Sequence, residues 1–254
     1  MFIKKIIFLF FFLFNIGLVQ AGIDIDHWVT SEGAKVYLVK SKHLPILDIN
    51  VSFKAGSARD NKANNGVASL TNHLMLLGSN GVSKLNLANQ ITDIGAQLDS
   101  SFDRDKSSFS LRTLVENQDK AIELFNLVLH KPNFDKSILN REKKKYLASI
   151  RQGETEPSSI GSKVFMKALY GDHSYGLPKS GTVETIKQLT SKQLKDFYNN
   201  YYLSNQAAIV IVGDISTKNA KALATNISKG LPNNSKATFY TKVKKSVSQE
   251  IMIP

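Results

Sequence analysis

The sequence contains no cysteine, so neither disulfide bonds nor thiolate–metal sites contribute to its fold. Glycine-rich loops of the P-loop or dinucleotide-binding kind are also missing, which leaves nucleotide-dependent chemistry without a motif. No Gly-x-Ser-x-Gly nucleophile elbow occurs, which argues against an α/β-hydrolase site. These absences direct attention to hydrolytic, binding and structural functions that use histidine, carboxylate and hydroxyl side chains.

Acidic residues are outnumbered, with 21 Asp and Glu against 33 Lys and Arg and a formal net charge of +12. The lysines are scattered, apart from a cluster at Lys143–Lys145 that favours a solvated helix face. No interleaving of aromatic and basic residues accompanies them, so we expect no nucleic-acid partner. The positive net charge is also compatible with association of the protein with an anionic membrane surface.

Residues 1–21 have the organisation of a secretory signal peptide. Lys4 and Lys5 form a positive start, an apolar run follows from Ile6 to Val19, and Ala21 ends a small-residue cleavage site. We expect export to the periplasm or secretion, and the alternative is an uncleaved membrane anchor. The remaining residues, 22–254, are numerous enough to bury a hydrophobic core without disulfides.

The segment Gly66–Gly78 is predicted to be an amphipathic helix. Its apolar residues recur at spacings of three and four, which places them on one stripe; they are Val67, Leu70, Leu74 and Leu77. Asn64 or Asn65 is expected to cap the start of this helix, and Gly78 to end it.

Elsewhere, segments with strand character alternate with groups of helices. A hairpin is expected over 28–40, strands over 47–53, 96–102, 107–114 and 207–213, and helices over 85–95, 116–130, 134–152, 159–169, 190–201 and 217–231. Because strands and helices do not alternate one by one, the pattern predicts an α+β fold, a mostly antiparallel sheet packed by helices. We expect one domain over 22–245, with residues 246–254 starting a linker or second domain that is truncated.

Three side chains leave one face of the 66–78 helix together, namely Ser69, Asn72 and His73 at positions i, i+3 and i+4. In helix-borne zinc sites two histidines at i and i+4 bind the metal, and a glutamate at i+3 acts as general base. Here only His73 has that chemistry. The helix therefore has the spacing of an H-x-x-E-H site without most of its donors.

Several further segments, in order along the chain, resemble the insulinase, pitrilysin and mitochondrial-processing-peptidase family of inverted-motif zinc peptidases. The resemblance covers about residues 28–245, and its segments are 54–60, 66–78, 94–99, 129–134, 169–176, 181–186 and 209–214. It implies a peptidase-like half-domain and is closest to the shorter, exported bacterial members.

The resemblance also implies where a zinc site would lie. The family's first histidine falls on Ser69, its base on Asn72, its second histidine on His73, and its distant glutamate on Ser149. Glu142 is the nearest acid but lies two helical turns from the required position, so we do not expect it to substitute. His73 remains as a vestigial ligand, and we expect no catalytic residue and no bound cofactor, whereas active relatives use zinc. Replacing His73 by alanine should then leave folding almost unchanged.

A nucleophilic hydrolase site also stays open for these side chains. Ser69 and His73 could hydrogen-bond as a nucleophile and base, with Asp99 or Asp103 behind them, although no oxyanion loop accompanies them. The family's substrate-binding edge strand falls on Gly95–Ser100, where its glycine pattern is not kept, which puts backbone-mediated peptide capture in doubt. His173 fits a structural loop, and His27 and His43 are expected at the surface.

The sequence therefore suggests a non-catalytic peptidase homologue that shapes a peptide-binding chamber. Its partner would be a homologous active subunit or a second copy of itself, and peptides are its candidate ligands. The alternatives are a zinc-dependent endopeptidase with altered ligands and an inert truncated gene product.

Overall fold

Alternating apolar and polar residues make Ile46–Phe53 a strand, β3, that buries one face and exposes the other. The computed structural model describes residues 24–79, 81–233 and 242–243. Leu47, Ile49, Val51 and Phe53 point into the core, as the sequence pattern predicts. The strand lies inside a sheet, because it pairs with other strands along both edges.

In the described part of the chain this main sheet has six strands in the order β1-β2-β8-β3-β7-β6. Their bounds are Asp26–Val29 (β1), Lys35–Lys40 (β2), Ala208–Gly213 (β8), Ser107–Leu114 (β7) and Gln97–Phe102 (β6). Neighbours are antiparallel except β2 and β8, which run parallel. The predicted α+β class and mostly antiparallel sheet are thus confirmed, and β6 forms the edge beside the candidate site.

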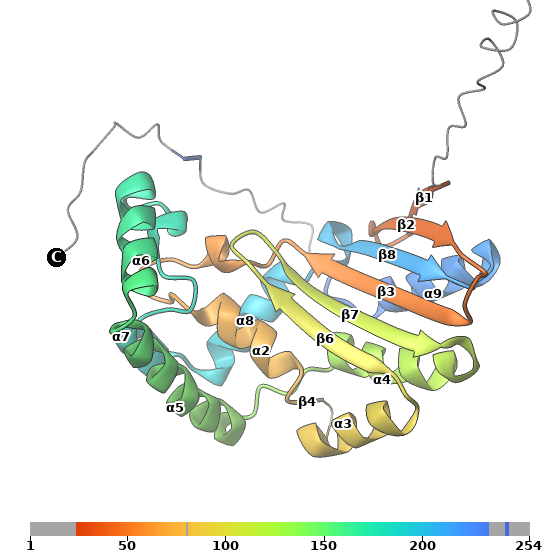
Figure 1. Ribbon diagram of the computed structural model, residues 1–254, viewed down its shortest axis with the longest axis horizontal. Coiled ribbons are helices and arrows are strands. Elements are labelled where there is room, and N and C mark those ends of the chain that lie inside the picture. Colours follow the sequence, from red (N-terminus) through yellow and green to blue (C-terminus); the bar gives the residue numbers. More distant parts are fainter. Residues whose placement is uncertain (1–23, 80, 234–241, 244–254) are drawn as a thin grey trace, which may run out of the picture.

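Helices cover one face of this sheet and extend beyond its β6 edge (Figure 1). They are Val67–Met75 (α2), Lys84–Asp93 (α3), Gln118–His130 (α4), Lys136–Gly153 (α5), Pro157–Tyr170 (α6), Val183–Gln188 (α7), Ser191–Tyr201 (α8) and Thr217–Lys229 (α9). Short 3-10 turns occupy Ser57–Arg59, Val115–Asn117, Ser174–Gly176 and Ser204–Gln206, and a small hairpin pairs Gly78–Ser79 (β4) with Val82–Ser83 (β5). The α7 helix and the β4–β5 hairpin were not expected from the sequence.

Aromatic side chains join the sheet to α8 in the core. Tyr202, just after α8, is fully buried, and its ring lies 5.1 Å from that of Phe53 and 6.3 Å from that of Phe109. Burial of such rings contributes on the order of 2–3 kcal/mol each. Because α2 packs against α8 and β6, this core fixes where α2 sits.

The start of α2 differs from the prediction. Its N-cap is Gly66, with φ of 94°, and neither Asn64 nor Asn65 caps it with a side chain. The buried carboxylate of Asp60 instead accepts hydrogen bonds from the backbone N–H groups of Gly66 (2.7 Å) and Ala68 (3.1 Å). A more distant acid thus satisfies two N–H groups that a local cap would serve.

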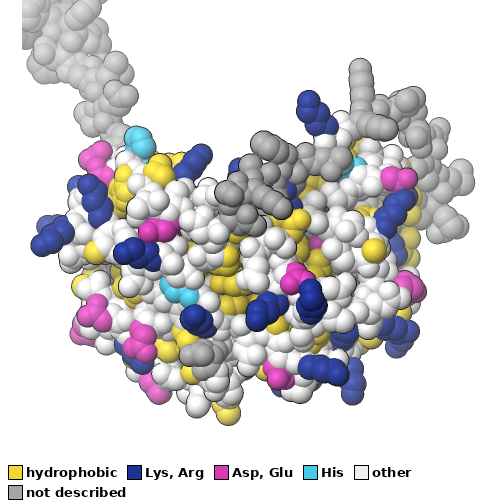
Figure 2. Space-filling view, turned by 180° about the vertical axis from the view of Figure 1, so that it is seen from behind, with side chains coloured by type: hydrophobic (Ala, Val, Ile, Leu, Met, Phe, Trp, Pro, Cys, Tyr) yellow, Lys and Arg dark blue, Asp and Glu magenta, His cyan; other side chains and the backbone are white. Residues whose placement is uncertain are grey.

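Positive and negative side chains are interspersed over the helical side of the molecule (Figure 2). Within the described residues no helix is long and apolar enough to cross a membrane. The expected signal peptide, 1–21, and the expected terminal segment, 246–254, lie outside the described residues.

Candidate functional site

The three side chains singled out on α2 have different environments. Ser69 and Asn72 are buried, whereas the His73 side chain is 39% exposed and faces α5. The helix holds these positions because its apolar stripe is buried and Asp60 anchors its first turn. The predicted common face exists, but only His73 opens toward solvent.

Ser69 is hydrogen-bonded to α5 rather than free to bind a ligand. Its Oγ lies 3.2 Å from the phenolic oxygen of Tyr146, which also donates to the Ser69 carbonyl at 3.4 Å. The Tyr146 ring lies 5.5 Å from the imidazole of His73. Burial raises the pKa of Tyr146, so its hydroxyl stays protonated near neutral pH. Tyr146 therefore holds the Ser69 side chain in place.

Asn72 is fixed by the two strands beside it. Its amide nitrogen donates to Ser107 Oγ at 2.7 Å and to the Ser101 carbonyl at 3.4 Å, and its oxygen accepts from Ser100 Oγ at 3.3 Å. Ser107 Oγ in turn lies 2.9 Å from the hydroxyl of buried Tyr202. An amide in this network has no basic lone pair with which to activate water. Asn72, on which the resemblance places the family's base, thus links α2 to β6 and β7.

His73 contacts Glu142, the acid that was not expected to act as a zinc ligand. Its Nε2 lies 3.0 Å from Oε2 of Glu142, whose side chain is only 2% exposed. Oε1 of Glu142 accepts hydrogen bonds from Arg141 Nε at 2.8 Å and from Lys145 Nζ at 3.0 Å. Burial would raise the pKa of Glu142, but the hydrogen bonds from His73, Arg141 and Lys145 outweigh it and lower this pKa to about 2.

The contact between Glu142 and His73 was not foreseen from the sequence, and Ser149 lies exposed on the same helix. The expectation that Glu142 does not substitute for the family's distant glutamate stays a prediction. Helical phase was the available signal, because Leu139, Glu142 and Tyr146 are spaced by three and four residues. Glu142 therefore occupies the stripe of α5 that faces α2.

This donor set does not fit a catalytic zinc ion. Such sites use about three protein ligands and a water, and here only His73 and Glu142 have ligating groups of the right kind. Oε1 of Glu142 already pairs with Arg141 and Lys145 and its Oε2 contacts His73, and the Ser69 and Asn72 side chains are held in other hydrogen bonds. Among the described residues no group of three or more His, Cys, Asp or Glu side chains could hold a metal.

The groups of the alternative nucleophile–base site are not brought together either. His73 contacts Glu142, and Asp103 uses its Oδ1 to accept from the backbone N–H groups of Asp105 and Lys106. Ser69 Oγ is paired with Tyr146, and Asp99 lines a groove on the other side of His73.

His27, His43 and His173 lie where the sequence placed them. His27 and His43 are exposed. His173 accepts from the backbone N–H of Tyr175 and packs against Tyr170, which supports a structural loop.

A groove of about 570 Å³ runs beside His73, between α2, α3 and β6. Its walls are largely apolar, and the residues that line it include Leu76, Leu87, Ile91, Leu98 and, at the rim, Lys84 and Asp99. β6 pairs with β7 along one edge only, within the described sheet. An exposed strand edge next to an apolar groove is an arrangement that extended peptides use for binding.

Comparison with protein families gives two matches along the chain. Residues 35–183 match the family model described as Insulinase (Peptidase family M16), and residues 188–252 match the one described as Peptidase M16 inactive domain. The first span ends and the second begins within α7, although β8, from the second span, lies in the middle of the same sheet.

Individual proteins agree with these matches. The uncharacterized zinc protease YmxG of Bacillus subtilis is 24% identical over 76% of this chain and 47% of its own length. The mitochondrial-processing peptidase subunit beta of Saccharomyces cerevisiae is 26% identical over 66% of this chain and 36% of its own. The chain thus spans about half the length, or less, of these curated relatives.

Solved structures share the fold. A structure titled peptidase M16 inactive domain, from Pseudomonas fluorescens, superposes with a TM-score of 0.84 at 33% identity, over 87% of this chain and 54% of that one. Pitrilysin superposes with a TM-score of 0.77 at 20% identity, over 90% of this chain and 26% of its own.

Proposed function

The chain belongs to the insulinase family of peptidases, family M16, and on this premise we propose that it is a non-catalytic member that holds peptides for a partner subunit. One observation carries the proposal. The α2 face that would supply a metal ligand and a base carries Ser69 and Asn72, and both are hydrogen-bonded into the surrounding fold. Without these donors, neither zinc binding nor activation of water has the groups it needs.

Peptide binding is supported by the surface next to this site. An extended peptide pairing with the free edge of β6 would place alternate side chains toward the groove lined by Leu76, Leu87 and Ile91. An apolar side chain there would bury surface at about 25 cal/mol per Å². The substrate class is therefore extended peptides with an apolar residue.

A partner is the second part of the proposal. The match covers only 47% of the relative named zinc protease and 36% of the one named mitochondrial-processing peptidase subunit beta. A homologous subunit that carries an intact zinc site would supply the catalytic groups that this chain lacks. Export to the periplasm, proposed from residues 1–21, would place both in the same compartment, and N-terminal sequencing of the native protein tests that step.

Peptide binding is tested with unfolded, fluorescently labelled peptides and the purified chain. We expect binding without cleavage, and no effect of a metal chelator. Ala88, exposed at the groove, should weaken binding about tenfold when replaced by tryptophan, because the indole fills the space. Asn89→Trp, at an exposed neighbouring position outside the groove lining, is the matched control and should bind normally.

Two results would overturn the proposal. Chelator-sensitive cleavage that disappears in His73→Ala would establish a zinc endopeptidase with altered ligands. Equal effects of the Ala88 and Asn89 variants would place peptide binding elsewhere.

A further inference from the structure

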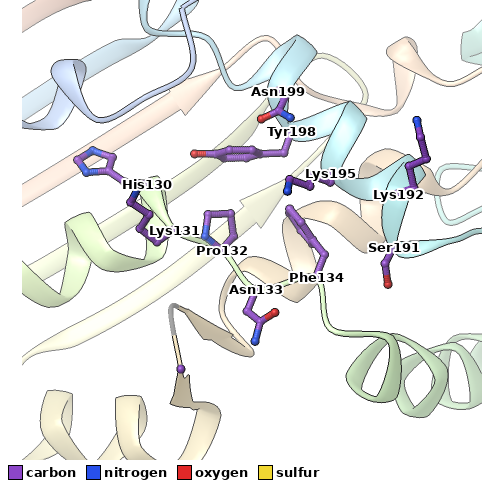
Figure 3. Close-up of a pocket in the computed structure, with 11 residues that line it drawn as sticks. His130, Lys131, Pro132, Asn133, Phe134, Ser191, Lys192, Lys195, Tyr198 and Asn199 are labelled. Atoms are coloured by element: carbon purple, nitrogen blue, oxygen red, sulfur yellow. The ribbon is translucent and has the colours of Figure 1, made fainter.

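A second cleft lies away from the groove beside His73. It has a volume of about 720 Å³ and is formed between the α4–α5 connection and the first turns of α8 (Figure 3). Its size falls within the range of small-molecule sites. Neither β6 nor the α2 face contributes to it, so a ligand there would not occupy the proposed peptide groove.

The charges around this cleft all have one sign. Lys131 comes from the α4–α5 connection, Lys192 and Lys195 come from α8, and none of the described lining residues is acidic. Lys192 is paired with Asp196 at 2.6 Å, but Lys131 and Lys195 have no ion pair in the part of the chain that the structure describes. In Figure 3 Lys195 extends toward the 131–134 segment, whereas Lys192 extends away from it. Two unneutralised ammonium groups on opposite walls attract anions.

The walls that carry these lysines are held in place. The α4–α5 connection is tied to β4, because Asn133 N–H donates to the Gly78 carbonyl at 3.1 Å and Pro132 forms a bridge with Ser79. On the α8 side the Tyr198 hydroxyl donates to the Leu129 carbonyl at 2.7 Å, and its ring lies 6.0 Å from that of Phe134. The cleft is therefore largely formed before a ligand binds, which lowers the cost of binding.

We propose that this cleft is a binding site for a small polyanion that carries two or more phosphate or carboxylate groups. Lys131 and Lys195 bind separate anionic groups from the two walls. The aromatic rings of Phe134 and Tyr198 pack against the body of the ligand. The phosphate groups can belong to a free metabolite or to a lipid headgroup, since both offer the same oxygens.

Calorimetric titration of the full chain with inorganic pyrophosphate, and separately with citrate, tests the site. We expect a dissociation constant of about 100 µM or lower for at least one of them. Lys131→Ala combined with Lys195→Ala should weaken binding at least about tenfold, because two charge-assisted hydrogen bonds are lost.

The matched control replaces two exposed lysines outside the cleft, Lys144→Ala with Lys163→Ala, and changes the net charge equally. Its titrations should match those of the wild type. Equal weakening in both double variants would show diffuse attraction and overturn the proposal.

A second measurement identifies the source of the anion. If pyrophosphate and citrate fail to bind, sedimentation with phosphatidylglycerol vesicles shows whether a headgroup occupies the site. Vesicle binding that requires Lys131 and Lys195 supports the site with a lipid anion. No binding in either format overturns it.

Discussion

Glu142 is a buried carboxylate that joins α2 to α5. It contacts the imidazole of His73 on α2 and two cations of its own helix, Arg141 and Lys145. Removing one partner from a buried charge is costly, because the charge loses stabilisation that water no longer supplies. From the sequence, replacing His73 by alanine was expected to leave folding almost unchanged, and this contact changes that expectation.

We therefore expect His73→Ala to reduce the free energy of unfolding by about 1 kcal/mol, because Glu142 keeps two of its three partners. Glu142→Gln should cost more, about 2–3 kcal/mol, since all three charge-assisted bonds weaken. Urea denaturation at pH 7 measures both variants, with exposed Lys144→Ala as the control. A loss in His73→Ala equal to that in Glu142→Gln would show that the histidine is the main support.

The pH dependence of the Glu142 contribution has a definite sign. Its pKa is lowered to about 2 in the folded chain, from 4.5, so its stabilisation is complete above pH 4.5 and is lost as the pH falls toward 2. The difference in stability between wild type and Glu142→Gln should therefore shrink between pH 4.5 and pH 2. A constant difference over that interval would contradict the ionic role.

Asp60 has the opposite dependence. Burial raises its pKa to about 7, from 3.8, although Gly66, Ala68 and Asn65 donate hydrogen bonds to it. A raised folded-state pKa gives stability that is complete below pH 3.8 and is lost as the pH rises through 7. Asp60→Asn removes this titration and leaves one N–H at the start of α2 without an acceptor.

We expect Asp60→Asn to lower stability by about 1–3 kcal/mol at pH 5, and this deficit should narrow toward pH 8. Chemical denaturation at both pH values measures it, and Asn61→Asp, at an exposed neighbour, serves as the charge control. A deficit that widens with pH would mean that the ionised carboxylate is the stabilising form.

At the scale of elements, the periodic parts of the chain were predictable and the contacts between them were not. The alternation in β3 and the apolar stripe of α2 come from local spacing, and both were recovered. The cap of α2 was missed because Asp60 lies six residues before Gly66, the residue whose N–H it binds, and no short capping motif has that spacing. The partner of His73 was missed because a contact across 69 residues depends on how α2 and α5 pack.

The packing of α2 and α5 also determines what would restore a zinc site. Ser69→His, Asn72→Glu and Ser149→Glu are the substitutions that the family resemblance implies, and no one of them supplies three ligands and a base. We expect each single variant to bind no stoichiometric zinc and the triple variant to bind one ion, because ligands act as a set. Elemental analysis after dialysis measures this, with the wild-type chain as the zinc-free reference.

The triple variant should be less stable than the wild type when no metal is bound. Asn72→Glu breaks the hydrogen bond to Ser107 and places a charge among buried side chains. Its stability without metal should therefore lie below that of the wild type. One tightly held zinc in the wild type, or in Ser69→His alone, would contradict the assignment of a degenerate site.

At the scale of the whole molecule, α6 stands out because none of its residues is buried. Phe165 is 63% exposed and Leu169, one turn further on the same side, is 38% exposed. Exposed apolar residues on one helix mark an interaction surface when they are contiguous. The proposed partner has this chain's own fold, so a second copy is the available substitute for it in purified samples.

We therefore expect the purified chain to self-associate through α6, with an interface of at least roughly 1,000 Å². Sedimentation velocity over a range of concentrations should show a dimer that Phe165→Asp shifts toward monomer, because a buried carboxylate cannot be paired there. Val29→Asp, at an equally exposed apolar position on β1, should leave the dimer intact. A monomer at all concentrations up to about 100 µM, a range that corresponds to weak association, would remove α6 as the interface and leave the partner's contact to another surface.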